Sequence, residues 1–242
     1  MELTSLKAVS DIQKKDYDKI TTVKIINECS PNIFRKICKF TNLRTLNITT
    51  ESKLNITHHI SNLTSLTHLE IQAMTCTNFA NNITKLSTLE KITLHTYTKQ
   101  IFPPSIANLQ NLNYMHINGC DITLPDEFAE LQKLRHYESP NSIDHPNIYT
   151  HDNKMLIMCF TSIIIINPDV THLNILYNAG GNLDTLPMSL QHLTIANLST
   201  PLLNLPTSLK TLNLCWEDNF TDEIPEHDIK LPYGCTYTKT VA

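Results

Sequence analysis

Histidine is the residue type in this chain with the widest range of possible chemistry. The 242 residues include 11 histidines, and an imidazole can bind a metal, transfer protons or switch an interface near neutral pH. Three of them, His68, His172 and His192, each precede a leucine in closely similar segments. This recurrence indicates that a repeated element displays these histidines on one surface. We expect that surface to bind a partner, with or without pH dependence.

A second group of chemically capable residues lies in the segment from Ser139 to Asn153. It contains Asp144, His145, His151 and Asp152, and acid and histidine residues in one loop can act as general acids and bases. No recognisable nucleophile signature accompanies them. A hydrolase-type enzyme with its site in 139–153 is therefore an alternative to a simple solvated loop.

The sequence shows few of the motifs that bind metals or nucleotides. Paired cysteines and an H-x-x-x-H helix motif are both missing, and so are the glycine-rich phosphate loops, since the four glycines are scattered. The sequence therefore predicts no metal, no cofactor and no enzymatic activity. The seven cysteines are widely spaced and odd in number, so we expect reduced thiols that pack in the core.

The charge and the apolar runs limit the possible partners and compartment. The net charge is −4 and charged residues make up 17%, which disfavours a basic nucleic-acid groove or a polybasic membrane patch. The N-terminus has no apolar h-region, and the longest apolar stretch is too short to span a bilayer. We expect a soluble, intracellular protein that binds neither nucleic acid nor membrane.

The elements that must position the histidines form a repeat. Segments of the form L-x-x-L-x-L begin at residues 20, 43, 66, 89 and 112, so each step is 23 residues, and further copies begin at 134, 170, 190 and 209. The apolar–polar alternation predicts a half-buried strand in each copy. The preceding I-x-x-L-x-x-L, with period three, predicts a short 3₁₀ or helical turn over the same core.

This unit, I-x-x-L-x-x-L-x-x-L-x-L, resembles the leucine-rich repeat family over residues 20 to about 225. The segments 103–112 and 124–131 are especially similar to it, and the C-terminal copies resemble a shorter type built on Leu-Pro-x-Ser-Leu. The resemblance implies an α/β solenoid of about nine or ten repeats. Its curved parallel sheet would form the concave face, and short helices, 3₁₀ turns and loops the convex face. The family's usual asparagine is missing from most repeats, so we expect no continuous asparagine ladder.

In such a sheet the residues between the apolar positions form outward-facing rows. The first row would contain His68, Lys91, Tyr114, His136, His172 and His192, and the second Asn174 and Thr194 among others. His95, His116 and His136 would form a diagonal, and His172 and His192 would lie side by side. Trp216 would either anchor a partner or pack on the C-terminal cap. The candidate partner-binding residues are His68, Glu70, Lys91, His95, Tyr114, His116, His136, Glu138, His172, Tyr177, His192 and Trp216.

The ends and one gap depart from the repeat. We expect residues 1–19 to form an amphipathic helical cap, 20–225 the repeats of one domain, and 226–242 a C-terminal cap. The irregular insertion at about 139–165 leaves two interpretations open. It holds one degenerate 18-residue repeat with Met155 and Ile157 inward, or a loop over 139–153 followed by a strand at 163–166.

The resemblance implies a non-enzymatic module that binds a partner protein on the concave face. The alternatives are a self-associating scaffold protein, of unknown oligomeric state, and the hydrolase described above. The Asn, Thr and Ile bias is typical of an AT-rich genome. Because such repeat proteins are frequent in intracellular parasites and large viruses, we also expect a role in host–pathogen or host–virus interaction.

Overall fold

The chain forms two compact units. The computed structural model describes residues 1–138, 148–158, 166–177, 183–196, 198, 200–216 and 229–241. Unit 1 comprises residues 1–125 and 136–145, and unit 2 comprises residues 126–135 and 146–242.

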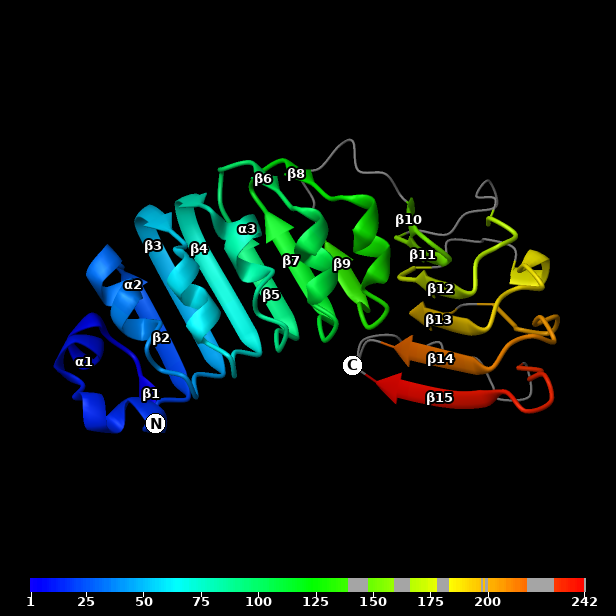
Figure 1. Ribbon diagram of the computed structural model, residues 1–242, viewed down its shortest axis with the longest axis horizontal. Coiled ribbons are helices and arrows are strands. Elements are labelled where there is room, and N and C mark those ends of the chain that lie inside the picture. Colours follow the sequence, from blue (N-terminus) through cyan, green and yellow to red (C-terminus); the bar gives the residue numbers. More distant parts are fainter. Residues whose placement is uncertain are drawn as a thin grey trace. The chain divides into compact units, whose positions relative to one another are not determined.

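Unit 1 is built on a parallel sheet of seven strands. Their order is β1 (Glu2–Leu3), β2 (Thr22–Asn27), β3 (Thr45–Asn55), β4 (His68–Thr77), β5 (Lys91–His95), β7 (Tyr114–Asn118) and β9 (His136–Glu138) (Figure 1). Leu46 pairs with Leu69, Leu69 with Ile92, and Ile92 with Met115. Each of these steps is 23 residues, so the predicted repeat is the actual strand register.

Short helices cover one side of this sheet. They are α1 (Leu6–Asp11), η1 (Lys14–Lys19), α2 (Pro31–Ile37), η2 (His58–Asn62), α3 (Phe79–Ile83) and η3 (Pro104–Asn108) (Figure 1). Ile60, Ile83 and Ile106 are fully buried, as expected for the apolar side of a repeated turn. Two short strands, β6 (Gln100–Ile101) and β8 (Ile122–Thr123), form a separate parallel pair.

Threonine and glutamine side chains hold the turns that follow the strands in unit 1. The amide N–H of Cys76 donates to Thr98 Oγ1 at 3.1 Å, and Gln100 Nε2 donates to the carbonyl of Cys76 at 3.0 Å. These bonds satisfy backbone groups that would otherwise be buried without partners. Polar side chains other than asparagine therefore fasten adjacent repeats here.

The first nineteen residues form three short elements in place of one helix. Leu3 in β1 pairs with Val23 in β2, and this strand pairing uses residues that the apolar spacing assigns to a helix. The helix that does form is only Leu6–Asp11, with Ser5 as its N-cap. Lys36 Nζ donates to the carbonyls of Ser10 (2.7 Å) and Ile12 (2.9 Å), at the C-terminal end of α1.

Unit 2 contains a six-stranded sheet. Its strands, in spatial order, are β10 (Ile148–His151), β11 (Lys154–Ile157), β12 (His172–Ile175), β13 (His192–Ala196), β14 (Thr211–Trp216) and β15 (Thr236–Val241), and only the β10–β11 pair is antiparallel. Two 3₁₀ helices, η4 (Asp126–Glu130) and η5 (Leu183–Thr185), also belong to this unit.

The irregular segment before β12 contains a degenerate repeat. Met155 pairs with Leu173 and Ile157 pairs with Ile175, and Met155 and Ile157 are 3% and 0% exposed. The degenerate-repeat interpretation is therefore confirmed. The other interpretation, which makes 139–153 a loop, is wrong because β10 lies within that range. That interpretation also places a strand at 163–166. Residues 163–165 lie outside the described residues, and Ile166 is not in a strand.

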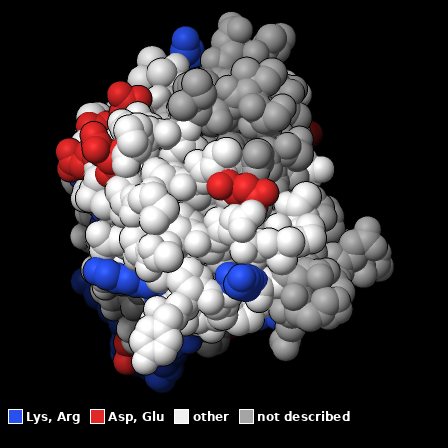
Figure 2. All heavy atoms as spheres, turned by 90° about the vertical axis from the view of Figure 1, so that its right-hand side faces the viewer, with Lys and Arg blue, Asp and Glu red and all other residues white. Residues whose placement is uncertain are grey.

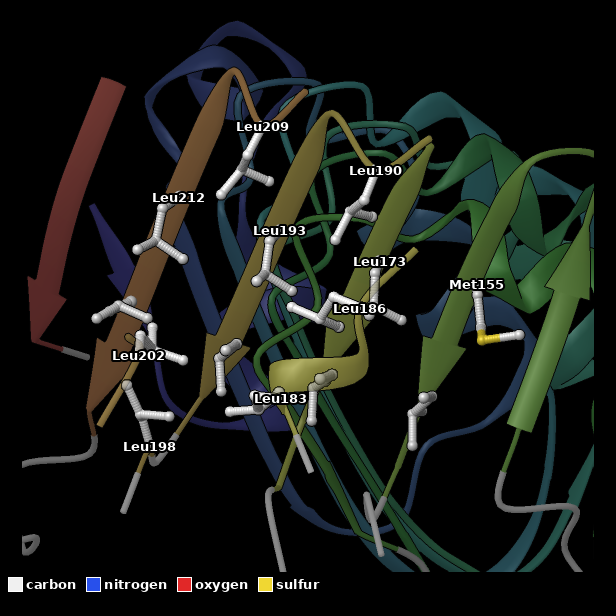
Figure 3. Packing of buried hydrophobic residues seen from close by; sticks show 14 of the residues in the cluster. Met155, Leu173, Leu183, Leu186, Leu190, Leu193, Leu198, Leu202, Leu209 and Leu212 are labelled. Carbon is white, nitrogen blue, oxygen red and sulfur yellow. The ribbon is translucent and has the colours of Figure 1, made fainter. Parts of the chain in front are cut away.

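The core of unit 2 is a set of parallel leucine rows. Figure 3 shows Met155, Leu173, Leu193 and Leu212 on successive strands, with Leu183 and Leu186 from the η5 region packed in the same cluster. Ser189 and Ser208 explain the Leu-Pro-x-Ser-Leu pattern. Their hydroxyls donate to the carbonyls of Val170 (2.8 Å) and Leu190 (2.7 Å), one short repeat earlier.

Buried cysteines belong to these cores. Cys29, Cys38 and Cys76 are free and buried, and burial raises the pKa of each thiol to about 12. Such thiols are inert at neutral pH, which agrees with the predicted role as small core residues. Within the described residues, no helix is both long and apolar enough to cross a bilayer.

Replacement of a core leucine should test the stacking directly. We expect Leu193→Ala to lower the free energy of unfolding by about 2–5 kcal/mol, because Leu193 is fully buried and its removal leaves a cavity. Met188→Ala is the matched control, since Met188 is 66% exposed. Urea denaturation followed by circular dichroism measures both, and equal midpoints for the two variants would contradict the packing.

Gly119 provides a second test, of the turn after β7. Its φ is +91°, and an added Cβ would lie 2.7 Å from the backbone oxygen of Thr96. Gly234 also has a positive φ, +78°, but an added Cβ there meets nothing within 4 Å. We expect Gly119→Ala to lower the thermal midpoint more than Gly234→Ala, because only the first adds a clash with backbone to the strain of φ. Similar losses for both variants would contradict the close approach.

Candidate binding surface

The outward-facing rows of unit 1 follow the predicted register. The first row contains Thr45, His68, Lys91, Tyr114 and His136; the second contains Asn47, Glu70, Thr93 and His116; the third contains Thr49, Gln72, His95 and Asn118. The alternate residues are buried, whereas His68, Glu70, Lys91 and His95 are exposed and Tyr114, His116 and His136 are half-buried. The predicted positions of these seven candidates are confirmed.

Three residues of the first row stack across adjacent strands. Lys91 Nζ lies 4.2 Å from the centroid of the Tyr114 ring, within the range of a cation–π interaction. The rings of Tyr114 and His136 are parallel within 4°, with centroids 4.4 Å apart. The stack Lys91–Tyr114–His136 therefore presents a cation, a phenol and an imidazole in fixed positions on the sheet.

Two ring contacts bear on the predicted histidine diagonal. The His95 and His116 rings are 5.7 Å apart and tilted by 32°. His136 stacks on Tyr114, which lies directly opposite it in the register, where side chains are closer than on the diagonal. His68 is paired locally, with its Nδ1 2.8 Å from Thr67 Oγ1.

A hollow of about 490 Å³ lies over the third row, beside the β-bulge of β3 and β4 and the carboxyl ends of β5 and β7. Its lining residues are Thr49, Thr50, Glu51, Gln72, Ala73, Met74, His95, Thr96, Tyr97, Asn118 and Gly119. Met74 and Tyr97 are 56% and 76% exposed. Both residues stand where the family usually has asparagine. The sequence does not reveal the hollow, because it is formed by four strands together.

The first row of unit 2 is also rich in histidine. It contains His151, Lys154, His172, His192, Thr211 and Thr236. The His172 and His192 rings stack with centroids 4.3 Å apart and an interplanar angle of 27°, which confirms that they lie side by side. His192 Nδ1 is 2.8 Å from Thr211 Oγ1, so the row continues as hydrogen bonds.

Glu130 joins the antiparallel hairpin to η4. His151 Nδ1 donates to Glu130 Oε1 at 3.0 Å, and Lys154 Nζ donates to Glu130 Oε2. Glu127 and Asp152 also lie 3.9 Å and 3.8 Å from His151 nitrogens. Glu130, His151 and Asp152 could together hold a metal ion, but Lys154 already neutralises the Glu130 carboxylate. The group acts as an ion-paired clamp.

These contacts shift the pKa values in opposite directions. The hydrogen bond with Glu130 raises the pKa of His151 above its ordinary value. Burial lowers the pKa of His172, which the neighbouring His192 and Lys154 lower further, and burial and Lys210 lower the pKa of His192. Burial alone would raise the pKa of Glu130, but hydrogen bonds from Lys154 and His151 outweigh it and hold the pKa below its ordinary value.

The second row of unit 2 is buried at Asn174 and Thr194. The sequence predicts Asn174 and Thr194 as exposed positions, and this is wrong: they are 0% and 6% exposed. Asn174 Nδ2 donates to the carbonyl of Leu134 at 2.9 Å, and the Phe128 and Tyr149 rings meet edge-on at 5.1 Å. Segment 126–135 covers this part of the sheet, so the more accessible rows are those of unit 1.

The remaining candidates are placed less fully. Tyr177 lies two residues after β12 and is 46% exposed. Glu138 is the last residue of β9 and Trp216 is the last residue of β14, but the structure does not describe their side chains. Asp144 and His145 lie outside the described residues. Sequence reasoning missed Glu130 and Lys154. Lys154 could have been found by continuing the 18-residue spacing, whereas nothing in the sequence singles out Glu130.

The chain matches the family described as a leucine-rich repeat region over residues 21–152, more than half of its length. The chain belongs to the leucine-rich repeat family. Its parallel sheets, short helices and stacked leucine rows are the α/β solenoid fold of that family. Leucine-rich repeat domains commonly mediate protein–protein interaction.

Solved structures with a similar fold are distant in sequence. Internalin C2 of Listeria monocytogenes is 19% identical, with 77% of this chain and 75% of that one covered, at a TM-score of 0.47. Internalin F of the same organism is 17% identical, with 89% and 53% covered, at 0.42. A leucine-rich repeat protein of Leptospira interrogans is 17% identical, with 96% and 63% covered, at 0.37. The chain thus spans less than two thirds of the last two proteins. No curated protein matches this sequence.

Charge is dispersed on the face of the leucine-rich repeat protein drawn in Figure 2. Most of its described surface is uncharged, and the acidic and basic side chains form small separate groups. Long-range electrostatic steering needs a continuous field of one sign. The described part of this face shows no such continuous field.

The opposed pKa shifts in unit 2 predict the order of histidine titration. His151 should titrate at higher pH than His172 and His192, as measured by the NMR signals of the imidazoles. Its contribution to stability is complete below the ordinary histidine pKa, about 6.5, and is lost as pH rises through the raised value. His172 and His192 act oppositely: their lowered pKa values cost stability as pH falls from about 6.5 through those values.

Glu130→Gln should lower the pKa of His151, because it removes the charge that accepts the 3.0 Å hydrogen bond. Glu127→Gln is the matched control and should have a smaller effect, since Glu127 is 3.9 Å away. An unchanged His151 titration in Glu130→Gln would contradict the clamp.

Proposed function

We propose that this protein is a non-enzymatic interaction module whose unit 1 sheet face binds a partner protein. The observation that supports it most is the Lys91–Tyr114–His136 stack on an exposed, polar sheet face. Aromatic residues held in one conformation are favoured as interface anchors, because little side-chain entropy is lost when they bind.

The neighbouring residues suit a protein surface as the ligand. His68, Glu70 and His95 lie on the same sheet face with exposed hydrogen-bond donors and acceptors. A non-obligate interface typically has such a polar rim around a central aromatic patch. The partner would therefore be recognised by shape and hydrogen bonds more than by net charge.

Unit 2 contributes less open surface to the proposal. Asn174 in its second row is covered by segment 126–135, and its first-row histidines His172 and His192 are paired with one another and with threonines. His172, His192 and Tyr177 remain proposed contact residues at the edge of that covered region. That the module acts inside a host cell stays a prediction from composition.

A pair of lysine variants tests the assignment. Lys91 lies on the sheet face and Lys85 on the helical side of unit 1, and both are exposed. With the full chain as bait in lysate of expressing cells, we expect Lys91→Ala to reduce recovery of the partner about fivefold or more, the loss expected of a hot-spot residue. Lys85→Ala should leave recovery unchanged.

A photo-reactive residue in place of Tyr114 should cross-link to that same partner, whereas one in place of the exposed Gln110 on the helical side should not. Equal recovery with Lys91→Ala and Lys85→Ala, together with cross-links from position 110 only, would place the binding surface elsewhere.

A further inference from the structure

The hollow of unit 1 has the size of a binding site. Its volume of about 490 Å³ is within the range of roughly 300–1,000 Å³ that is typical of ligand pockets. It can therefore accept one long side chain with its flanking backbone. Met74 and Tyr97, both well exposed, offer apolar surface to the stem of such a side chain.

The lining of the hollow favours a cation. Glu51 is its one formally charged residue when histidine is counted as neutral. A second acid, Glu70, lies on the same face of β4, two residues before Gln72. Neither lysine nor arginine contributes to the lining, so the only formal charge in the lining is the negative charge of Glu51.

Three polar side chains of the hollow are available. Among the described residues, the side chains of Glu51, Gln72 and Tyr97 make no hydrogen bond or ion pair. An occupant can therefore gain hydrogen bonds there without breaking internal ones. A carboxylate and an amide oxygen are acceptors, which matches a ligand with several N–H donors.

We propose that the hollow binds an arginine side chain of the partner protein, which rests on the function proposed above. Glu51 in β3 and Met74 in β4 lie at the β-bulge where the register shifts between Thr50 and Lys53, and Tyr97 follows β5 by two residues. Adjacent strands are about 4.8 Å apart, so a guanidinium over Met74 lies about 5 Å from each flanking strand. From there it stacks on Tyr97, and its N–H groups donate to the carboxylate of Glu51.

Arginine fits these groups better than lysine. Its guanidinium is planar and weakly hydrated, so it stacks on an aromatic ring while its edge donates two parallel hydrogen bonds. The ammonium of lysine is a compact, strongly hydrated point charge that cannot do both. The hollow therefore discriminates by shape as well as by charge.

Small amides test the site without a partner. We expect N-acetyl-arginine amide to shift the NMR signal of the Met74 methyl group saturably, while the methyl signal of the exposed Met188 in unit 2 stays unmoved. N-acetyl-citrulline amide, which has nearly the same shape without the charge, and N-acetyl-lysine amide should bind at least about threefold more weakly. Equal shifts from citrulline or lysine amide would overturn the arginine site.

Charge-matched variants of the full chain provide the control. Glu51→Gln should weaken binding of the arginine amide about three- to fivefold, as expected for a partly exposed ion pair. Glu90→Gln removes the same charge from the opposite end of β5 and should leave binding unchanged. Equal weakening by both variants would mean that binding depends on the net charge of the protein and not on Glu51 in particular, and would overturn the proposal.

The outcome separates this inference from the proposed function. A failed arginine titration together with a Lys91→Ala variant that loses its partner overturns the arginine site alone. A normal titration with partner recovery insensitive to Lys91→Ala overturns the sheet-face function and leaves the arginine site in place.

Discussion

Parallel pairing of strands between successive repeats is the interaction on which the rest of this structure depends. A single repeat has one apolar side on its strand and another on its turn, and it cannot bury both by itself. Pairing Leu46 with Leu69, and Leu69 with Ile92, closes the core between neighbours and at the same time aligns the intervening polar residues into rows. The binding surface is therefore a direct consequence of core packing.

The stack formed by Lys91, Tyr114 and His136 illustrates how this register produces a site. These residues are 23 and 22 positions apart in the chain, and only the pairing of β5, β7 and β9 brings them into contact. Adjacent rings in the register stack closely, whereas the diagonal pair His95–His116 stays 5.7 Å apart. Preorganised side chains of this kind lose less entropy on binding than mobile ones.

The two units are built from the same kind of repeat but differ in how much of the sheet face stays exposed. Unit 1 leaves its polar rows accessible, and a hollow forms at their carboxyl end. In unit 2, segment 126–135 packs on the sheet face and is held by the Glu130 clamp and by Asn174. One buried amide and one ion-paired carboxylate thus remove part of a repeated surface from solvent.

The sequence by itself determined the strand positions and the direction of each side chain, and hence the rows. The 23-residue repeat sets which strand residues pair, and the apolar–polar alternation sets which side chains point inward. It also indicated the degenerate repeat through Met155 and Ile157. It could not determine which outward positions stay exposed. Asn174 reads as a surface residue and is fully buried, since Leu131 and Leu134 belong to a segment some forty residues earlier.

Only the tertiary structure decided that Glu130 pairs with His151 and Lys154, and that Glu51, Met74 and Tyr97 share one hollow. Such groupings depend on contacts between residues of different repeats and on turn conformations such as that of Gly119. Local periodicity carries no information about these contacts, because a solenoid repeats its core while each turn and covering segment is individual.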